Sequence, residues 1–144
     1  MSLVVDYTRR LLGLSRALRA WLGLLAQLDG RRQDKVARFA DAIAATLARA
    51  VEAFERIEKE PSSRSARRAA IRELGRLSGY VEGIVAALDG HVDGRRLAGI
   101  KKRLEGLAAD GLIAASVNNA DAQRIDRLSA SEGYFRALAD GLRT

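Results

Sequence analysis

The sequence predicts an all-α protein, an antiparallel bundle of four to five helices. Apolar residues recur at alternating steps of three and four over long stretches, the pattern of amphipathic helices that pack against one another. The 144 residues contain one proline, Pro61, so little interrupts helix formation. Short polar segments separate the apolar stretches, and short connections make successive helices antiparallel neighbours.

Long helices are expected at about 3–28, 31–59 and 64–89. Pro61 ends the second, and Ser62-Ser63 can cap the third. The apolar seam of the first helix consists of Val4, Tyr7, Leu11, Leu14, Leu18, Trp21, Leu25 and Leu28.

A short repeat accompanies these helices. The octapeptides at 23–30 and 83–90 both end in L-D-G, and glycine readily adopts the left-handed conformation that ends many helices. Both are therefore predicted as helix C-termini. A second repeated segment, D-G-R-R, occurs at 29–32 and 93–96. Duplication of a helical hairpin is therefore an alternative explanation.

The pattern is weaker beyond Gly94. A shorter helix is expected at about 95–109, followed by a C-terminal helix that ends at about 142. That last helix begins near Asp121 in one alternative. In the other it begins at Ser129, where S-x-x-E has the spacing of a capping box, and the segments 112–117 and 123–128 pair as a small β-hairpin.

The stretch R-L-E-G-L-A-A-D-G-L-I at 103–113, followed by Leu128-Ser129, resembles the recognition helix and wing of MarR-type repressors. The resemblance covers only about 100–140, and it implies a winged-helix C-terminal part that contacts DNA. The chain departs from the family upstream, because the ten residues 91–100 are too few for the extra helix that the family places there.

The composition indicates one globular domain spanning 1–144. No cysteine is present, which excludes disulfides and thiolate metal ligands and favours a reducing, cytoplasmic compartment. Arg9, Arg10, Arg16 and Arg19 interrupt the first apolar run, so neither a signal peptide nor a transmembrane helix is expected. The net charge of +7 favours acidic partners such as nucleic acid, anionic membrane or acidic protein.

Catalytic and metal-binding patterns are missing. The chain contains no G-x-S-x-G, H-E-x-x-H, Walker or G-x-G-x-x-G motif. His91 is the single histidine, and Asp89 and Asp93 flank it without completing a calcium-loop pattern. We expect a solvated turn there, no enzymatic activity, no cofactor and no metal.

Two groups of basic residues are candidate anion-binding sites. Arg64, Arg68, Arg72 and Arg76 recur every four residues and so lie along one side of a helix, a row that would follow the phosphates of a nucleic acid. The second group has no acidic residue within it and consists of Arg95, Arg96, Lys101, Lys102 and Arg103. The alternative interpretation of the arginine row is a solvated helix face.

Gly75, Gly79 and Gly83 recur every four residues on the same helix. Each glycine costs about 1 kcal/mol relative to alanine, so the series indicates close packing within the chain or between subunits. The leading expectation is a non-catalytic interaction or assembly protein that forms a homo-oligomer or binds a protein partner. Nucleic-acid binding through the arginines is the alternative, and attachment of the first helix to a membrane surface has less support.

Overall fold

The computed structural model describes residues 6–107 and 111–143, and these residues form seven helices and no strand. The helices are α1 (Tyr7–Ala20), α2 (Leu22–Leu25), α3 (Gly30–Lys59), α4 (Arg64–Leu88), α5 (Gly94–Leu107), α6 (Leu112–Asn118) and α7 (Ala122–Leu142). The predicted all-α bundle is confirmed, and the long α3, α4 and α7 pack together within it.

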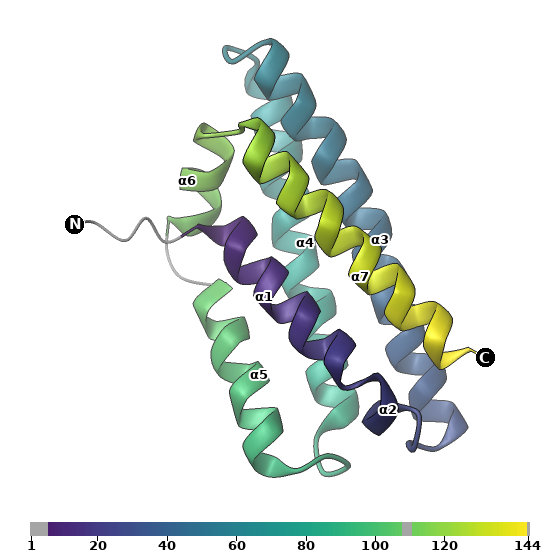
Figure 1. Cartoon of the computed structure of the whole chain (residues 1–144). Coiled ribbons are helices and arrows are strands. Elements are labelled where there is room, and N and C mark those ends of the chain that lie inside the picture. The colour runs from purple at the N-terminus through teal and green to yellow at the C-terminus, as the bar shows by residue number, and fades with distance from the viewer. Residues whose placement is uncertain (1–5, 108–110, 144) are drawn as a thin grey trace.

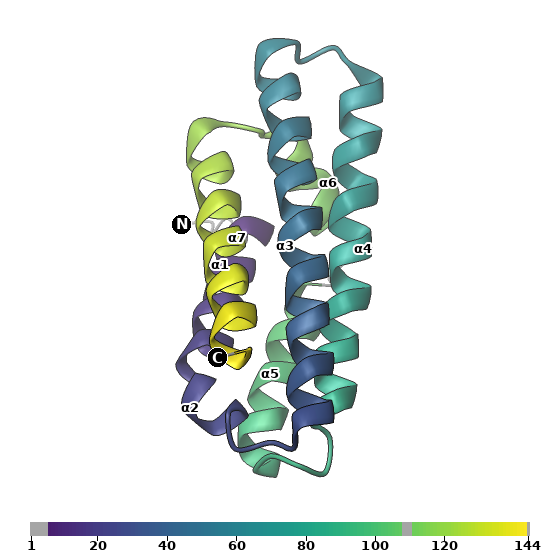
Figure 2. The ribbon, with the colours of Figure 1, turned by 90° about the vertical axis from the view of Figure 1, so that its right-hand side faces the viewer.

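The helices form a closed ring around one aliphatic core (Figures 1 and 2). The antiparallel pair α3 and α4 makes one side, and α7 packs antiparallel to α3. Helix α1 lies beside α7 and runs in the same direction. Helices α5 and α6 lie one above the other and close the ring between α1 and α4. The largest fully buried side chains include Tyr7, Phe54 and Phe135.

The first helix is shorter than the expected span of 3–28. Residues 3–5 lie outside the described residues, and α1 ends at Ala20, before a kink at Trp21 with φ −88° and ψ 4°. The single turn α2 follows. Its end is held by the side-chain amide of Gln33, which donates to the carbonyls of Ala26 at 2.6 Å and Leu28 at 2.7 Å.

The two L-D-G segments have opposite roles, which corrects the prediction that both end helices. Gly90 has φ +80° and follows the end of α4, as expected. Gly30 instead begins α3, because the carboxylate of Asp29 accepts a hydrogen bond from the backbone of Arg32 at 2.9 Å. Hydrogen bonds from the Arg32 backbone and guanidinium hold the pKa of Asp29 below its usual value. An aspartate in this position caps a helix N-terminus.

The second D-G-R-R segment also begins a helix. The Asp93 carboxylate accepts a hydrogen bond from the backbone N–H of Arg95 at 3.0 Å, and the Asp93 carbonyl accepts one from Leu97 at 3.0 Å. Segments 29–32 and 93–96 are therefore both helix starts. The shared letters reflect the same capping requirement at two places in the chain.

The C-terminal third contains no β-hairpin in its described residues. Residues 112–118 form α6, and Asp121 caps α7 by accepting from the backbone of Arg124 at 2.9 Å. Ser129 lies inside α7, so the alternative start there is wrong. Residues 123–128 belong to the same helix, which leaves no wing where the resemblance to MarR-type repressors implied one; residues 108–110 of that motif lie outside the described residues.

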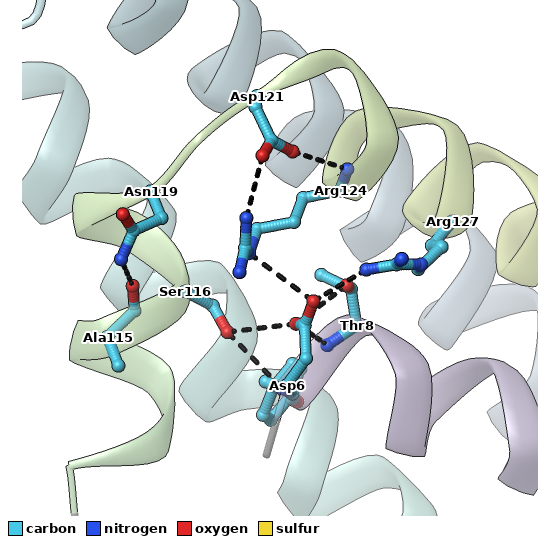
Figure 3. A network of polar contacts seen from close by, with 9 residues as sticks. Asp6, Thr8, Ala115, Ser116, Asn119, Asp121, Arg124 and Arg127 are labelled. Carbon is cyan, nitrogen blue, oxygen red and sulfur yellow. Dashed lines mark hydrogen bonds and ion pairs between the residues drawn. The ribbon is translucent and has the colours of Figure 1, made fainter. Parts of the chain in front are cut away.

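A buried carboxylate fixes the beginning of α1 (Figure 3). The side chain of Asp6 is only 4% exposed. Its Oδ1 accepts hydrogen bonds from the backbone of Thr8 at 2.9 Å and from the Thr8 hydroxyl at 2.8 Å, which caps α1. The hydroxyl of Ser116 on α6 lies 3.4 Å from the same oxygen and accepts a hydrogen bond from the backbone of Tyr7.

Two arginines of α7 neutralise this carboxylate. Arg127 Nη1 donates to Asp6 Oδ2 at 2.6 Å. Arg124 Nε lies 3.3 Å from the same oxygen, close enough for an ion pair although it is not aligned as a hydrogen bond. Both arginines are largely buried, with side chains 15% and 18% exposed. Asp6 therefore joins α1 to α6 and α7 in one network.

A second polar contact links α1 to the far side of the bundle. The Tyr7 hydroxyl donates to the carbonyl of Leu74 on α4 at 3.3 Å. Burial raises the pKa of this phenol well above its usual value, so it stays a neutral donor. The start of α1 is thus held from three sides.

Replacement of Asp6 by Asn is expected to destabilise the fold by about 3–5 kcal/mol, because the largely buried Arg127 loses its counter-ion and Arg124 keeps only its ion pair with Asp121. Urea unfolding followed by circular dichroism measures this. The matched control is Asp34→Asn, since Asp34 pairs with Arg38 on the exposed side of α3. Its expected cost is at most about 1 kcal/mol. Equal costs for the two variants would contradict a special role for Asp6.

Candidate anion-binding groove

Two antiparallel helices, α1 and α5, carry the same short pattern on the sides that face each other (Figure 1). The pattern is two basic residues, two others and a glycine. It occurs as R-R-L-L-G at 9–13 and as K-R-L-E-G at 102–106. Residues three and four positions apart share a helix face. Each helix therefore presents basic side chains next to a glycine.

The two patterns contact each other reciprocally. Arg10 Nη1 donates to the carbonyl of Gly106 at 2.6 Å, and it lies 2.8 Å from the place that a Cβ on Gly106 would occupy. Arg103 Nη1 in turn lies 3.4 Å from the Cβ position of Gly13. Each arginine of the pair thus extends over the glycine of the opposite helix.

A groove with a volume of about 580 Å³ follows this contact. Its lining consists of four basic residues and three glycines: Arg9, Arg10, Gly13, Gly99, Lys102, Arg103 and Gly106. The groove has no acidic residue in its lining.

The positive charge of the groove is not neutralised from within the described part of the chain. Arg9, Lys102 and Arg103 are exposed and form no ion pair with its residues. Arg10 is half-buried, and its hydrogen-bond partner is a carbonyl that carries no formal charge. Four like charges around a concave surface produce a field that attracts anions.

The acidic residues nearest in the sequence to the basic residues of the groove do not neutralise its positive charge. Asp6 precedes Arg9 and Arg10 by about one helical turn, but its carboxylate is buried against Arg124 and Arg127. Glu105 is exposed on α5 and forms no ion pair within the described residues.

The structure separates the basic residues singled out in the sequence. Lys102 and Arg103 line the groove, Lys101 is exposed beside them, and Arg95 and Arg96 are exposed at the start of α5. The arginine row of α4 lies elsewhere, on the half of that helix which is further from α5 and closer to α6 (Figure 1).

All four arginines of that row are exposed. Arg76 differs from the other three because it lies 3.7 Å from the Glu73 carboxylate and donates to the Tyr80 hydroxyl at 3.3 Å. The Tyr80 hydrogen bond and the charge of Glu73 raise the pKa of Arg76. The row is therefore an open surface, whereas the groove is concave.

Arg9 and Arg10 were not identified as binding residues from the sequence. In the sequence they are only charges that interrupt an apolar run, because nothing local indicates that 9–13 faces 99–106. The signal that points to them is the repeated pattern of two basic residues followed by a glycine three positions later.

The glycine series on α4 divides into two parts. A Cβ on Gly83 would lie 2.5–2.9 Å from ring atoms of Phe39 on α3, so this glycine allows close packing within the chain. Gly75 and Gly79 are exposed, and a Cβ on either would have no atom within 4 Å. Ile71, one turn before Gly75, is 45% exposed.

His91 is exposed in the turn between α4 and α5. Across residues 6–107 and 111–143, no three His, Asp or Glu side chains are grouped so that they could hold a metal ion. Nor does any helix in these two ranges have the length and apolar character needed to cross a membrane.

Comparison of the chain with protein-family models, with curated proteins and with solved structures finds no match.

Replacement of Gly83 by Ala is expected to destabilise the protein by about 1–3 kcal/mol, since the new methyl group overlaps the Phe39 ring. Gly79→Ala is the matched control on the same helix. It meets open space and is expected to stabilise the protein by up to about 1 kcal/mol through helix propensity. Thermal unfolding of both variants distinguishes these effects, and a stabilised Gly83→Ala would contradict the packing argument.

Proposed function

We propose that the protein is a non-catalytic binding protein that takes up phosphate-bearing polyanions, nucleic acid foremost, in the groove between α1 and α5. One observation carries this proposal: Arg9, Arg10, Lys102 and Arg103 line a single concave surface without a carboxylate partner among the described residues. Arginine guanidinium groups bind phosphate oxygens through paired hydrogen bonds, and lysine ammonium groups bind them as point charges. Contacts of this kind dominate the binding of proteins to nucleic acids.

The proposal favours phosphate contacts over base contacts. The chain has few aromatic side chains, at 5% of its residues, and none lines the groove. Stacking on bases is therefore a minor contribution, and we expect little sequence preference. Membrane attachment by the first helix has less support, because Leu11, Leu14 and Leu18 of its apolar seam are buried in the bundle. A cytoplasmic location belongs to the proposal, since a chain without cysteine suits a reducing compartment.

Fluorescence anisotropy with a labelled oligonucleotide tests this function. Affinity is expected to fall linearly on logarithmic axes between about 50 and 200 mM salt, with a slope of about −0.7 to −0.9 for each phosphate contacted. The double variant Lys102→Ala/Arg103→Ala is expected to bind more weakly at low salt, with a shallower slope.

The matched control is Arg68→Ala/Arg72→Ala, which removes the same charge from the exposed row on α4. This control is expected to keep most of the affinity. Equal losses in both variants would show that net charge, and not the groove, governs binding. No binding at low salt would refute the proposal.

Self-association is the second candidate function, and it is the leading expectation from the sequence. The observation that favours it is the outer face of α4, where exposed Ile71 lies beside Gly75 and Gly79 with nothing packed on either glycine. A helix of a second subunit or of a protein partner would approach such a flat surface closely.

Size-exclusion chromatography with light scattering is expected to show a homo-oligomer that Gly79→Leu weakens. The leucine side chain occupies the space that the partner helix needs, whereas within the chain it meets no atom near its Cβ. A monomer that is unchanged by Gly79→Leu would contradict this second function.

A further inference from the structure

The basic side chains of the groove form two separate pairs along its length. Arg10 lies opposite Gly106, and Arg103 lies opposite Gly13. The two contacts are three residues apart on each helix, which is about 4.5 Å along the helix axis. Arg9 precedes Arg10 in the sequence and Lys102 precedes Arg103, and both also line the groove. The groove therefore contains two cationic centres, one contributed mainly by each helix.

One of these centres is held in place by the fold. The hydrogen bond from Arg10 to the Gly106 carbonyl uses one of the five N–H donors of the guanidinium. The remaining donors are free to bind an anion in the forked geometry that suits phosphate. Gly106 makes this position possible, because a Cβ there would displace Arg10 Nη1.

We propose that the groove binds two phosphate groups of one ligand at the same time, one at Arg9/Arg10 and one at Lys102/Arg103. This inference rests on the proposed phosphate-binding function and specifies its ligand. The two contacts lie in one groove, about 4.5 Å apart along the helix axes, so a ligand with two linked phosphate groups can reach both centres at once. Successive phosphates of a nucleic-acid strand are linked in this way, as are neighbouring phosphates of an oligophosphate chain.

Isothermal titration with small anions tests the two centres. At fixed ionic strength, pyrophosphate, tripolyphosphate and the dinucleotide pTpT are each compared with orthophosphate. Two joined phosphates are expected to bind roughly a hundredfold more tightly than one, since the second contact becomes intramolecular. A preference for pTpT over the inorganic chains identifies a nucleic-acid strand as the source, and the reverse identifies an oligophosphate.

Removal of one centre separates this effect from charge alone. In Arg9→Ala/Arg10→Ala the advantage of pyrophosphate over orthophosphate is expected to fall to a few-fold. In Arg68→Ala/Arg72→Ala, with the same loss of charge on α4, the full advantage is expected to remain. An equal advantage in all three proteins would overturn the inference.

Gly106→Ala is a test that keeps every charge. The alanine is expected to move the flexible end of Arg10 and to weaken pyrophosphate binding about tenfold or more, without lowering the melting temperature. The control is Gly133→Ala on α7, outside the groove, where a Cβ would meet no atom within 4 Å. Unchanged pyrophosphate binding in Gly106→Ala would contradict a centre built on Arg10. Oligonucleotide binding that still depends on Lys102 and Arg103 would leave the proposed function standing in that case.

Discussion

The buried carboxylate of Asp6 is the interaction on which the arrangement of the other helices depends. A charge removed from water is tolerated only when opposite charges and hydrogen bonds replace its hydration. Arg124, Arg127 and Thr8 do so here, and Ser116 completes the network. Because these partners come from α1, α6 and α7, the requirement to satisfy one carboxylate fixes three helices relative to one another.

This constraint also explains why the groove has its shape. Helix α1 is held by α7 and, through the hydrogen bond from Tyr7 to the Leu74 carbonyl, by α4. Its opposite side faces α5, where the two glycine-containing patterns meet. Asp6 would be the natural counter-ion for Arg9 and Arg10, one turn further along its own helix. Its engagement by α7 leaves those two arginines without a carboxylate partner among the described residues. A structural ion pair on one side of α1 thus produces an uncompensated charge on the other.

The sequence was informative where a pattern extends over many residues, as in α3 and α4, whose ends are predicted to within one residue. It was not informative where the same short segment occurs both at the start and at the end of a helix. Asp29 accepts a hydrogen bond from the Arg32 backbone and begins a helix, whereas the backbone N–H of Asp89 donates to the Val85 carbonyl at the end of one. Helix α6 is too short to show a helical period. Part of the groove was identified through Lys102 and Arg103. Its other half was not, because the pairing of 9–13 with 99–106 exists only in three dimensions.

The formation of the groove depends on a contact between the two ends of the chain, because α1 and α7 close the ring of helices. Helices α3 and α4 are neighbours in the chain and need only a short loop to meet, so their contacts are local. The contacts of Asp6 with Arg124 and Arg127 span more than a hundred positions, so they cannot form before the C-terminal helix has been synthesised. During synthesis, α1 therefore reaches its final position only after α7 has been made. The groove then takes its final shape only as the last helix docks, although that helix contributes no side chain to its lining.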